Sequence, residues 1–201
     1  MKTKTWINET DSLSALLQSL VFTDVSGKIT NTDLAFELWS DWAIELKKNA
    51  GTIYLIGNGA SASMASHYAA DLAKNGGLHT EVFSDLSLIT AISNDIGYEH
   101  VFSEPLKRRG KRGDILIAIS SSGKSPNILR AAKEAEKLQM KCVTLSAMSP
   151  DNPLRIIGTL NAYIPGDSYG HAETCHAAIL HYWMDLVCQK AGKGQAVRAK
   201  R

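Results

Sequence analysis

Cysteine is scarce in this sequence, with three residues among 201. Cys142, Cys175 and Cys188 are odd in number and form no Cys-x-x-Cys pair. Disulfide-rich scaffolds and cysteine-based zinc motifs both need paired cysteines, so neither class of protein is indicated. We therefore expect three reduced thiols.

Long apolar runs and a secretory leader pattern are also lacking. A membrane-spanning helix needs about 18 or more consecutive apolar residues, and a leader needs a basic, apolar and small-residue order before its cleavage site. Because neither pattern is found, we expect a cytoplasmic protein that does not enter a membrane.

An excess of one charge is lacking as well. The 22 lysines and arginines nearly balance the 20 aspartates and glutamates, which leaves a formal net charge of +2. This balance does not indicate nucleic acid or a membrane surface as a partner. The basic run LKRRGKRG at 106–113 falls between a predicted helix and a predicted strand, and we interpret it as a solvated surface.

The sequence does contain an alternation of short apolar runs and helical patterns. Helix-like stretches lead the chain at 9–22 and 31–49. Strand candidates and further helix-like stretches then alternate: strands at 52–56, 80–83, 114–119, 141–145 and 161–164, and helices at 60–75, 86–94, 125–140 and 171–190. This alternation predicts an α/β fold with a doubly wound, mainly parallel five-stranded sheet, helices on both faces, and functional sites at the carboxyl ends of the strands.

A single folded domain is the expectation for 201 residues of ordinary globular composition. We predict an N-terminal helical segment at 1–30, one α/β domain at 31–190 and a mobile basic tail at 191–201. The tail prediction depends on the absence of a periodic apolar face after residue 190.

Two strand-to-helix turns are rich in residues that bind anions. The first, GNGAS at 57–61, is explained equally well by a tight turn that needs positive φ. The second lies within DILIAISSSGKSPNIL at 114–129, where four serine hydroxyls surround Gly123 just before a helix. A capping role accounts for one of these serines, whereas a phosphate cup of hydroxyls and helix-end amides accounts for all four. We therefore predict phosphate binding at the second turn.

Titratable side chains recur at helical spacing. His67 and Asp71 are four residues apart and share one face of a helix. Glu173 and His181 are eight residues apart, slightly over two turns, and also point broadly the same way. His176 lies on a different face and has no predicted role. Each could be an ordinary surface or core residue, yet together two imidazoles and two carboxylates suit acid–base chemistry or a first-row metal.

The order of these features resembles a known family. The strand, the GNGAS turn, the helix of His67 and Asp71 and the segment ISSSGKSPNILRAAKEAEKLQMKCVTLS are similar to the sugar isomerase (SIS) domain, and most closely to sedoheptulose-7-phosphate isomerases, also called phosphoheptose isomerases. The similarity covers about residues 31–190 and includes SDLSLITAISNDIGYEHVFS at 84–103. It implies a flavodoxin-like fold, aldose–ketose isomerisation of a phosphorylated sugar, and a homotetramer with sites between subunits.

The resemblance also implies roles for individual residues. Acid–base catalysis falls to Asp71, Glu173 and His181, with either carboxylate as the base. One zinc ion per subunit would be held by His67, Asp71, Glu173 and His181. Contacts to the sugar and its phosphate fall to Asn58, Gly59, Ser61, Asp95, Ser120, Ser121, Ser122 and Ser125.

The sequence departs from the family's pattern within this site. Asp71 replaces the usual Glu, which shortens the side chain by one methylene, and Glu173 replaces the usual Gln, which adds a negative charge. Gly170 stands where the family has an aspartate, with Asp167 nearby. Two alternatives therefore stay open: a non-catalytic tetrameric binding protein of the replication-initiator-associating type, or an isomerase of another sugar phosphate.

The leading helices carry more large apolar side chains than one sheet face obviously needs. These residues are Phe36, Trp39, Trp42 and Leu46. They either belong to the core of the chain or, as the resemblance implies, pack between subunits.

Overall fold

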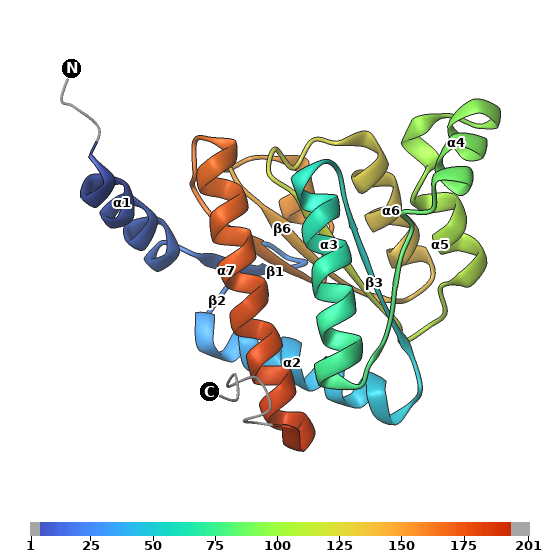
Figure 1. The fold of residues 1–201 in the computed structure, drawn as a ribbon, viewed down its shortest axis with the longest axis horizontal. Coiled ribbons are helices and arrows are strands. Elements are labelled where there is room, and N and C mark those ends of the chain that lie inside the picture. Colours follow the sequence, from blue (N-terminus) through green and yellow to red (C-terminus); the bar gives the residue numbers. More distant parts are fainter. Residues whose placement is uncertain (1–4, 194–201) are drawn as a thin grey trace.

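A seven-stranded sheet forms the centre of the computed structural model, which describes residues 5–193 (Figure 1). Its parallel strands occur where the sequence predicts them: β3 Thr52–Gly57, β4 His79–Val82, β5 Ile115–Ser120, β6 Lys141–Ser146 and β7 Leu160–Tyr163. Their order across the sheet is β7-β6-β5-β3-β4. The chain winds outward in both directions from the β3 and β5 pair, as in flavodoxin-like folds. The predicted α/β class is confirmed.

The sheet has two strands more than predicted. β1 (Val21–Asp24) and β2 (Ile29–Thr30) form an antiparallel hairpin, and β1 also pairs antiparallel with β7. The helix predicted at 9–22 ends earlier, as α1 (Trp6–Gln18). The expectation of helix through residue 22, and of an entirely helical segment before residue 31, was wrong.

The hairpin turn explains this error. Gly27 adopts φ +78°, and the Asp24 carboxylate accepts hydrogen bonds from the backbone amides of Ser26 and Lys28 over 2.8 and 3.0 Å. This is an Asx-type turn, whereas the apolar run before it continues the spacing of the preceding helix and carries no strand signal of its own.

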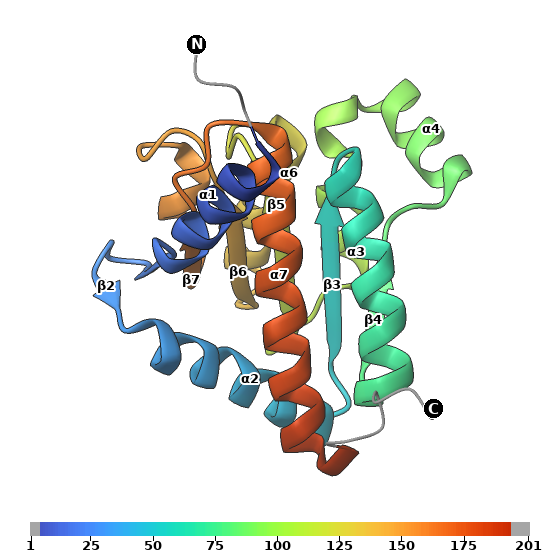
Figure 2. The same cartoon turned by 60° about the vertical axis from the view of Figure 1, so that its left-hand side comes forward.

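Helices cover both faces of the sheet (Figure 2). One face is covered by α2 (Thr32–Lys48), α3 (Ala60–Asp71) and α7 (Tyr169–Cys188), and the other by α4 (Leu86–Asp95), α5 (Ser103–Arg109) and α6 (Pro126–Lys137). Short π-helical turns extend α3 over Leu72–Gly76 and α7 over Gln189–Lys193, and 3-10 turns occur at Tyr98–His100 and Pro153–Ile156. Every predicted helix is present, and α5 is the one that sequence reasoning missed.

The strand β5 shows how the sheet separates two cores. Ile115, Ile117 and Ile119 point into the core beneath α2, α3 and α7, whereas Leu116 and Ala118 point into the core beneath α4, α5 and α6. Every residue of β5 is buried, which is expected of a central parallel strand covered on both faces.

The aromatic side chains of α2 belong mainly to this core. Trp39 stacks on Trp183 of α7 with ring centroids 4.3 Å apart, and both side chains are fully buried. Phe36 and Leu46 are buried as well, and Trp42 packs partly buried against the same cluster. These residues therefore pack mainly within one chain, as the core alternative expects, and packing between subunits stays a prediction.

Other sequence predictions concern the cysteines, the membrane and the tail. All three cysteines are free and buried, and burial raises the pKa of the Cys142 thiol to about 12. Within residues 5–193, no helix is both long enough and apolar enough to cross a bilayer. Residues 194–201 of the predicted tail lie outside the described residues, and the predicted domain boundaries stay predictions.

Candidate active site

The turn after β3 is shaped by two glycines. A Cβ atom on Gly57 would lie 2.5 Å from the backbone carbon of Ser61, so a side chain does not fit there. Gly59 adopts φ +54° immediately before α3, in the region that favours glycine. The tight reversal places Asn58 and Ser61 at the carboxyl end of the sheet, where the Ser61 amide donates to the Asn58 carbonyl over 3.0 Å.

The turn after β5 depends on Gly123 and on Asn152, which packs directly against it. Gly123 adopts φ +62°, and a Cβ atom there would lie 1.9 Å from Asn152 Oδ1. The hydroxyls of Ser120 and Ser125 lie 3.3 Å apart across this turn. Pro126 then starts α6 at a position where a helix needs no amide donor. The loop is therefore held close to the sheet with its hydroxyls gathered at one place.

These two turns enclose a small polar pocket, which we call the hydroxyl pocket. Its volume is about 130 Å³, and its lining residues are Asn58, Ser61, Ile119, Ser120, Ser121, Ser122, Ser125, Tyr169 and Glu173. It lies between the carboxyl ends of β3 and β5, the point where strand order reverses in a doubly wound sheet. All five serines predicted to hold phosphate are thus brought together.

Two predicted substrate residues are not among those that line this pocket. Gly59 shapes the turn and borders a neighbouring apolar hollow. Asp95 ends α4, and its carboxylate accepts a hydrogen bond from Asn94 over 2.9 Å. Tyr169, which does line the pocket, was missed; its only sequence signal is its place four residues before Glu173, on the same helical face.

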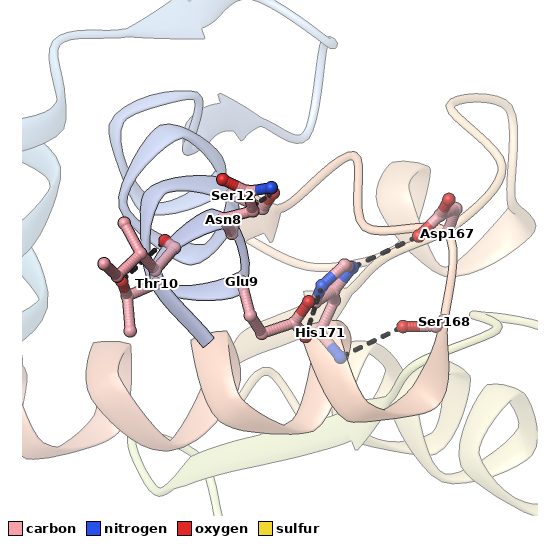
Figure 3. Close-up of polar contacts among 8 residues, drawn as sticks. Asn8, Glu9, Thr10, Ser12, Asp167, Ser168 and His171 are labelled. Atoms are coloured by element: carbon pink, nitrogen blue, oxygen red, sulfur yellow. Dashed lines mark hydrogen bonds and ion pairs between the residues drawn. The ribbon is translucent and has the colours of Figure 1, made fainter. Parts of the chain in front are cut away.

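The first turn of α7, beside the hydroxyl pocket, is tied to the N-terminal helix (Figure 3). His171 Nε2 lies 3.0 Å from a carboxylate oxygen of Glu9 in α1, and its Nδ1 lies 3.2 Å from a carboxylate oxygen of Asp167. Ser168 caps the helix by accepting from the His171 amide. These contacts fix the start of α7, and no sequence pattern had indicated them.

Three of the predicted catalytic and metal-binding residues meet where α3 and α7 lie side by side (Figures 1 and 2). We call His67, Asp71 and His181 the imidazole cluster. His67 Nε2 lies 3.5 Å from Asp71 Oδ2, and the two imidazole rings have centroids 5.7 Å apart. This arrangement brings a carboxylate and two imidazoles together at the contact between α3 and α7.

The ring of Tyr68 packs against both imidazoles of the imidazole cluster. It is buried, and its centroid lies 4.9 Å from that of His181 and 5.1 Å from that of His67. Its hydroxyl donates to the Ala177 carbonyl over 2.7 Å. Burial, with a smaller effect of the Asp71 carboxylate, raises the pKa of Tyr68 to about 12, so the phenol stays protonated.

Glu173 does not join the imidazole cluster. It lines the hydroxyl pocket, whereas His181 follows eight residues later on the same helix. At a rise of about 1.5 Å per residue, that separation is roughly 12 Å along the axis. The sequence spacing could not show that the two side chains lie at different positions along the helix axis.

The predicted zinc ligands are consequently not assembled within one chain. Among residues 5–193, no group of three or more histidine, cysteine, aspartate or glutamate side chains is placed to hold a metal ion. A structural or catalytic zinc site needs at least three protein ligands. The set His67, Asp71, Glu173 and His181 therefore does not fit zinc in this arrangement, and the metal remains a prediction for metal analysis of the purified protein.

His176 is a core residue. Its side chain is fully buried, and neither ring nitrogen has a hydrogen-bond partner among the described residues. Burial lowers the pKa of His176 to about 4, against a smaller opposing effect of the Ser146 backbone. The imidazole is therefore neutral at physiological pH and takes no part in the site.

The sequence of this chain is similar to those of known proteins. The SIS domain profile matches residues 25–147. The chain belongs to the SIS domain family. A phosphoheptose isomerase of Helicobacter pylori is 35% identical over 150 residues, covering 72% of this chain and 78% of the relative. One of Campylobacter jejuni is 35% identical over 156 residues, covering 75% and 81%.

Solved structures agree with this membership. A phosphoheptose isomerase of Neisseria gonorrhoeae superimposes with a TM-score of 0.71 at 29% identity, covering 76% of this chain and 85% of that one. The SIS fold of a second enzyme of that name, from Francisella tularensis, covers 92% of this chain with a TM-score of 0.77. Both turns that enclose the hydroxyl pocket lie within residues 25–147, which the SIS domain profile matches.

Proposed function

We propose that this SIS-domain chain is an aldose–ketose isomerase that interconverts sedoheptulose 7-phosphate and D-glycero-D-manno-heptose 7-phosphate. The observation that carries the proposal is the hydroxyl pocket, in which five serines from two neighbouring strand ends face one small space. The relatives that are 35% identical over more than 70% of the chain are named phosphoheptose isomerases.

The hydroxyl pocket would hold the phosphate. The serine hydroxyls are donors that suit a phosphate dianion, and both turns lead into the N-terminus of a helix, whose dipole favours an anion. Fixing the phosphate would direct the remaining carbons of the sugar toward the imidazole cluster. Such positioning lowers the barrier of a later step without taking part in it.

The imidazole cluster would perform the proton transfers. Isomerisation removes a proton from the carbon beside a carbonyl and returns one to the neighbouring carbon, through an enediol. We assign the base to Asp71 and the proton exchange at the sugar oxygens to His181. His67, 3.5 Å from Asp71, would orient that carboxylate.

Distance favours Asp71 over Glu173 as the base. The reacting carbons of a ketose 7-phosphate are C1 and C2, at the opposite end of the chain from the phosphate. Glu173 lines the phosphate pocket itself, whereas the imidazole cluster begins about two helical turns along α7. A carboxylate beside the phosphate would also meet an anion at close range, which is unfavourable.

The non-catalytic alternative is not favoured. A binding protein needs the hydroxyl pocket but has no use for a carboxylate and two imidazoles at the contact between α3 and α7. The curated relatives described above carry the names of isomerases. The other alternative, an isomerase of another sugar phosphate, differs from the proposal in the number of carbons in the substrate. A comparison of turnover among sugar phosphates of different length distinguishes the two.

The test is turnover of sedoheptulose 7-phosphate by the purified protein, compared with ketose phosphates of five and six carbons. We expect the seven-carbon substrate to give the highest kcat/KM and His181→Gln to lower kcat by about 100-fold or more. The matched control is His100→Gln, a histidine outside the pocket and the cluster, with kcat unchanged. No turnover of any ketose phosphate would overturn the proposal.

We also propose that the chain assembles as a homotetramer. Support comes from large apolar side chains that remain exposed on the N-terminal elements: Trp6, Ile7, Val25, Ile29, Leu34 and Leu38. Large apolar side chains left exposed in this way are typical of interfaces between copies. Sedimentation equilibrium is expected to give four times the chain mass of 21.8 kDa.

A further inference from the structure

Asn127, in the first turn of α6, has no role in the site described above. It follows Pro126 and is only 2% exposed. A buried amide is unfavourable unless its polar atoms are hydrogen-bonded, so the partners of Asn127 explain why it can occupy this position.

The side chain of Asn127 forms a reciprocal pair with Asn58. Asn58 Nδ2 donates to Asn127 Oδ1 over 3.0 Å, and Asn127 Nδ2 donates to Asn58 Oδ1 over 2.9 Å. The two residues are 69 positions apart in sequence and belong to the turns after β3 and β5. The pair therefore joins the two turns that enclose the hydroxyl pocket.

The hydrogen-bonding capacity of Asn58 is nearly used up by these contacts. Its oxygen can accept two hydrogen bonds and receives them from Asn127 and from the Tyr98 hydroxyl, the latter over 3.2 Å. Its nitrogen carries two hydrogens, one of which goes to Asn127. One N–H of Asn58 remains for a ligand, and Asn58 lines the pocket.

We propose that Asn127 is a positioning residue that holds the Asn58 amide as a hydrogen-bond donor toward the bound sugar phosphate. The role rests on the proposed function, because it assigns the remaining N–H to an oxygen of that substrate. Without Asn127, the Asn58 amide can rotate and present its oxygen, which repels the oxygens of a phosphorylated sugar.

A double-mutant cycle on ligand affinity tests this role. The affinity of the full-length protein for sedoheptulose 7-phosphate is measured by calorimetry for wild type, Asn58→Ala, Asn127→Ala and the double variant. Each single variant is expected to bind about tenfold more weakly. The double variant is expected to bind less than about threefold more weakly than Asn58→Ala, because Asn127 acts through Asn58. A merely structural role of Asn127 predicts independent losses that multiply to roughly 100-fold, and that result would overturn the proposal.

Asn161→Ala is the matched control. Asn161 is a fully buried amide on β7 that accepts from Thr144 and from the Gly158 amide, away from the hydroxyl pocket. Its loss should lower the melting temperature and leave affinity unchanged, whereas a tenfold loss of affinity would show that any buried amide has this effect. Asn127→Ser, which keeps one polar hydrogen, replaces the alanine variant if that variant does not fold.

The same measurements separate the positioning role from the proposed function. Binding by the wild type without turnover would overturn the isomerase function, but the double-mutant cycle on affinity would still test the positioning role of Asn127. Turnover with losses that multiply would overturn the positioning role alone. No binding by the wild type would overturn both.

Discussion

The hydroxyl pocket and the imidazole cluster are built in different ways. The pocket is formed mainly by turns that directly follow β3 and β5, so pairing of these two strands brings its serines together. The cluster is formed by α3 and α7, which meet through contacts between residues 109 positions apart, such as Tyr68 and Ala177. Local turns thus create the hydroxyl pocket, and packing of distant helices creates the imidazole cluster.

The largest expected effect comes from a change in the imidazole cluster. If Asp71 is the base, Asp71→Asn should lower kcat for sedoheptulose 7-phosphate by about 10²–10⁴-fold and change KM by less than about threefold. Ser121→Ala, in the hydroxyl pocket, should do the reverse and mainly raise KM. Steady-state kinetics of both variants checks this, and equal losses of kcat would break the distinction between the two regions.

The core side of α7, which supports both regions, should make stability depend on pH. His176 has a pKa of about 4 in the folded protein and about 6.5 when unfolded. Between these values the unfolded chain binds more protons, so the free energy of unfolding should fall as pH is lowered from 6.5 to 4, by about 3 kcal/mol in all. Denaturant unfolding across this range measures the slope, and His176→Gln should abolish this component.

A change in the backbone of the hydroxyl pocket should have a smaller effect. Gly123→Ala places a methyl group against Asn152 at φ +62°, so the serine loop must shift, and affinity for the sugar phosphate should fall about tenfold or more. Gly113→Ala is the control, because φ there is +89° with open space around it and no contact with the pocket. Calorimetry should show weakened binding for Gly123→Ala alone.

The smallest expected effect concerns the charge in the hydroxyl pocket. Glu173→Gln removes a carboxylate from the space assigned to the phosphate, and affinity for inorganic phosphate should rise about three- to tenfold at low salt. Asp167→Asn removes a charge nearby that is 90% exposed and should change affinity far less. A loss of phosphate affinity in Glu173→Gln would place the phosphate elsewhere.

Much of the pocket could be predicted because its signals are contiguous. The run SSSGKSP joins a buried strand to a helix, and the spacing alone indicated clustered hydroxyls, which the structure brings together. The hairpin at 21–30 escaped prediction because β1 is held by pairing with β7, 139 residues later at Leu160–Tyr163, and not by a strand pattern of its own. No sequence pattern indicated the hydrogen bonds of Asn127, because its partner Asn58 lies 69 positions away in another turn.

The amino-acid sequence by itself determined the parallel core, the glycine turns and the serine loop, because these depend on short-range backbone conformations and on the period of apolar residues. The tertiary structure decided which titratable groups meet. Helical spacing specifies the direction of Glu173 and His181, but their depth relative to α3 depends on how two helices pack on the sheet. That packing places His67, Asp71 and His181 together and leaves Glu173 with the serines.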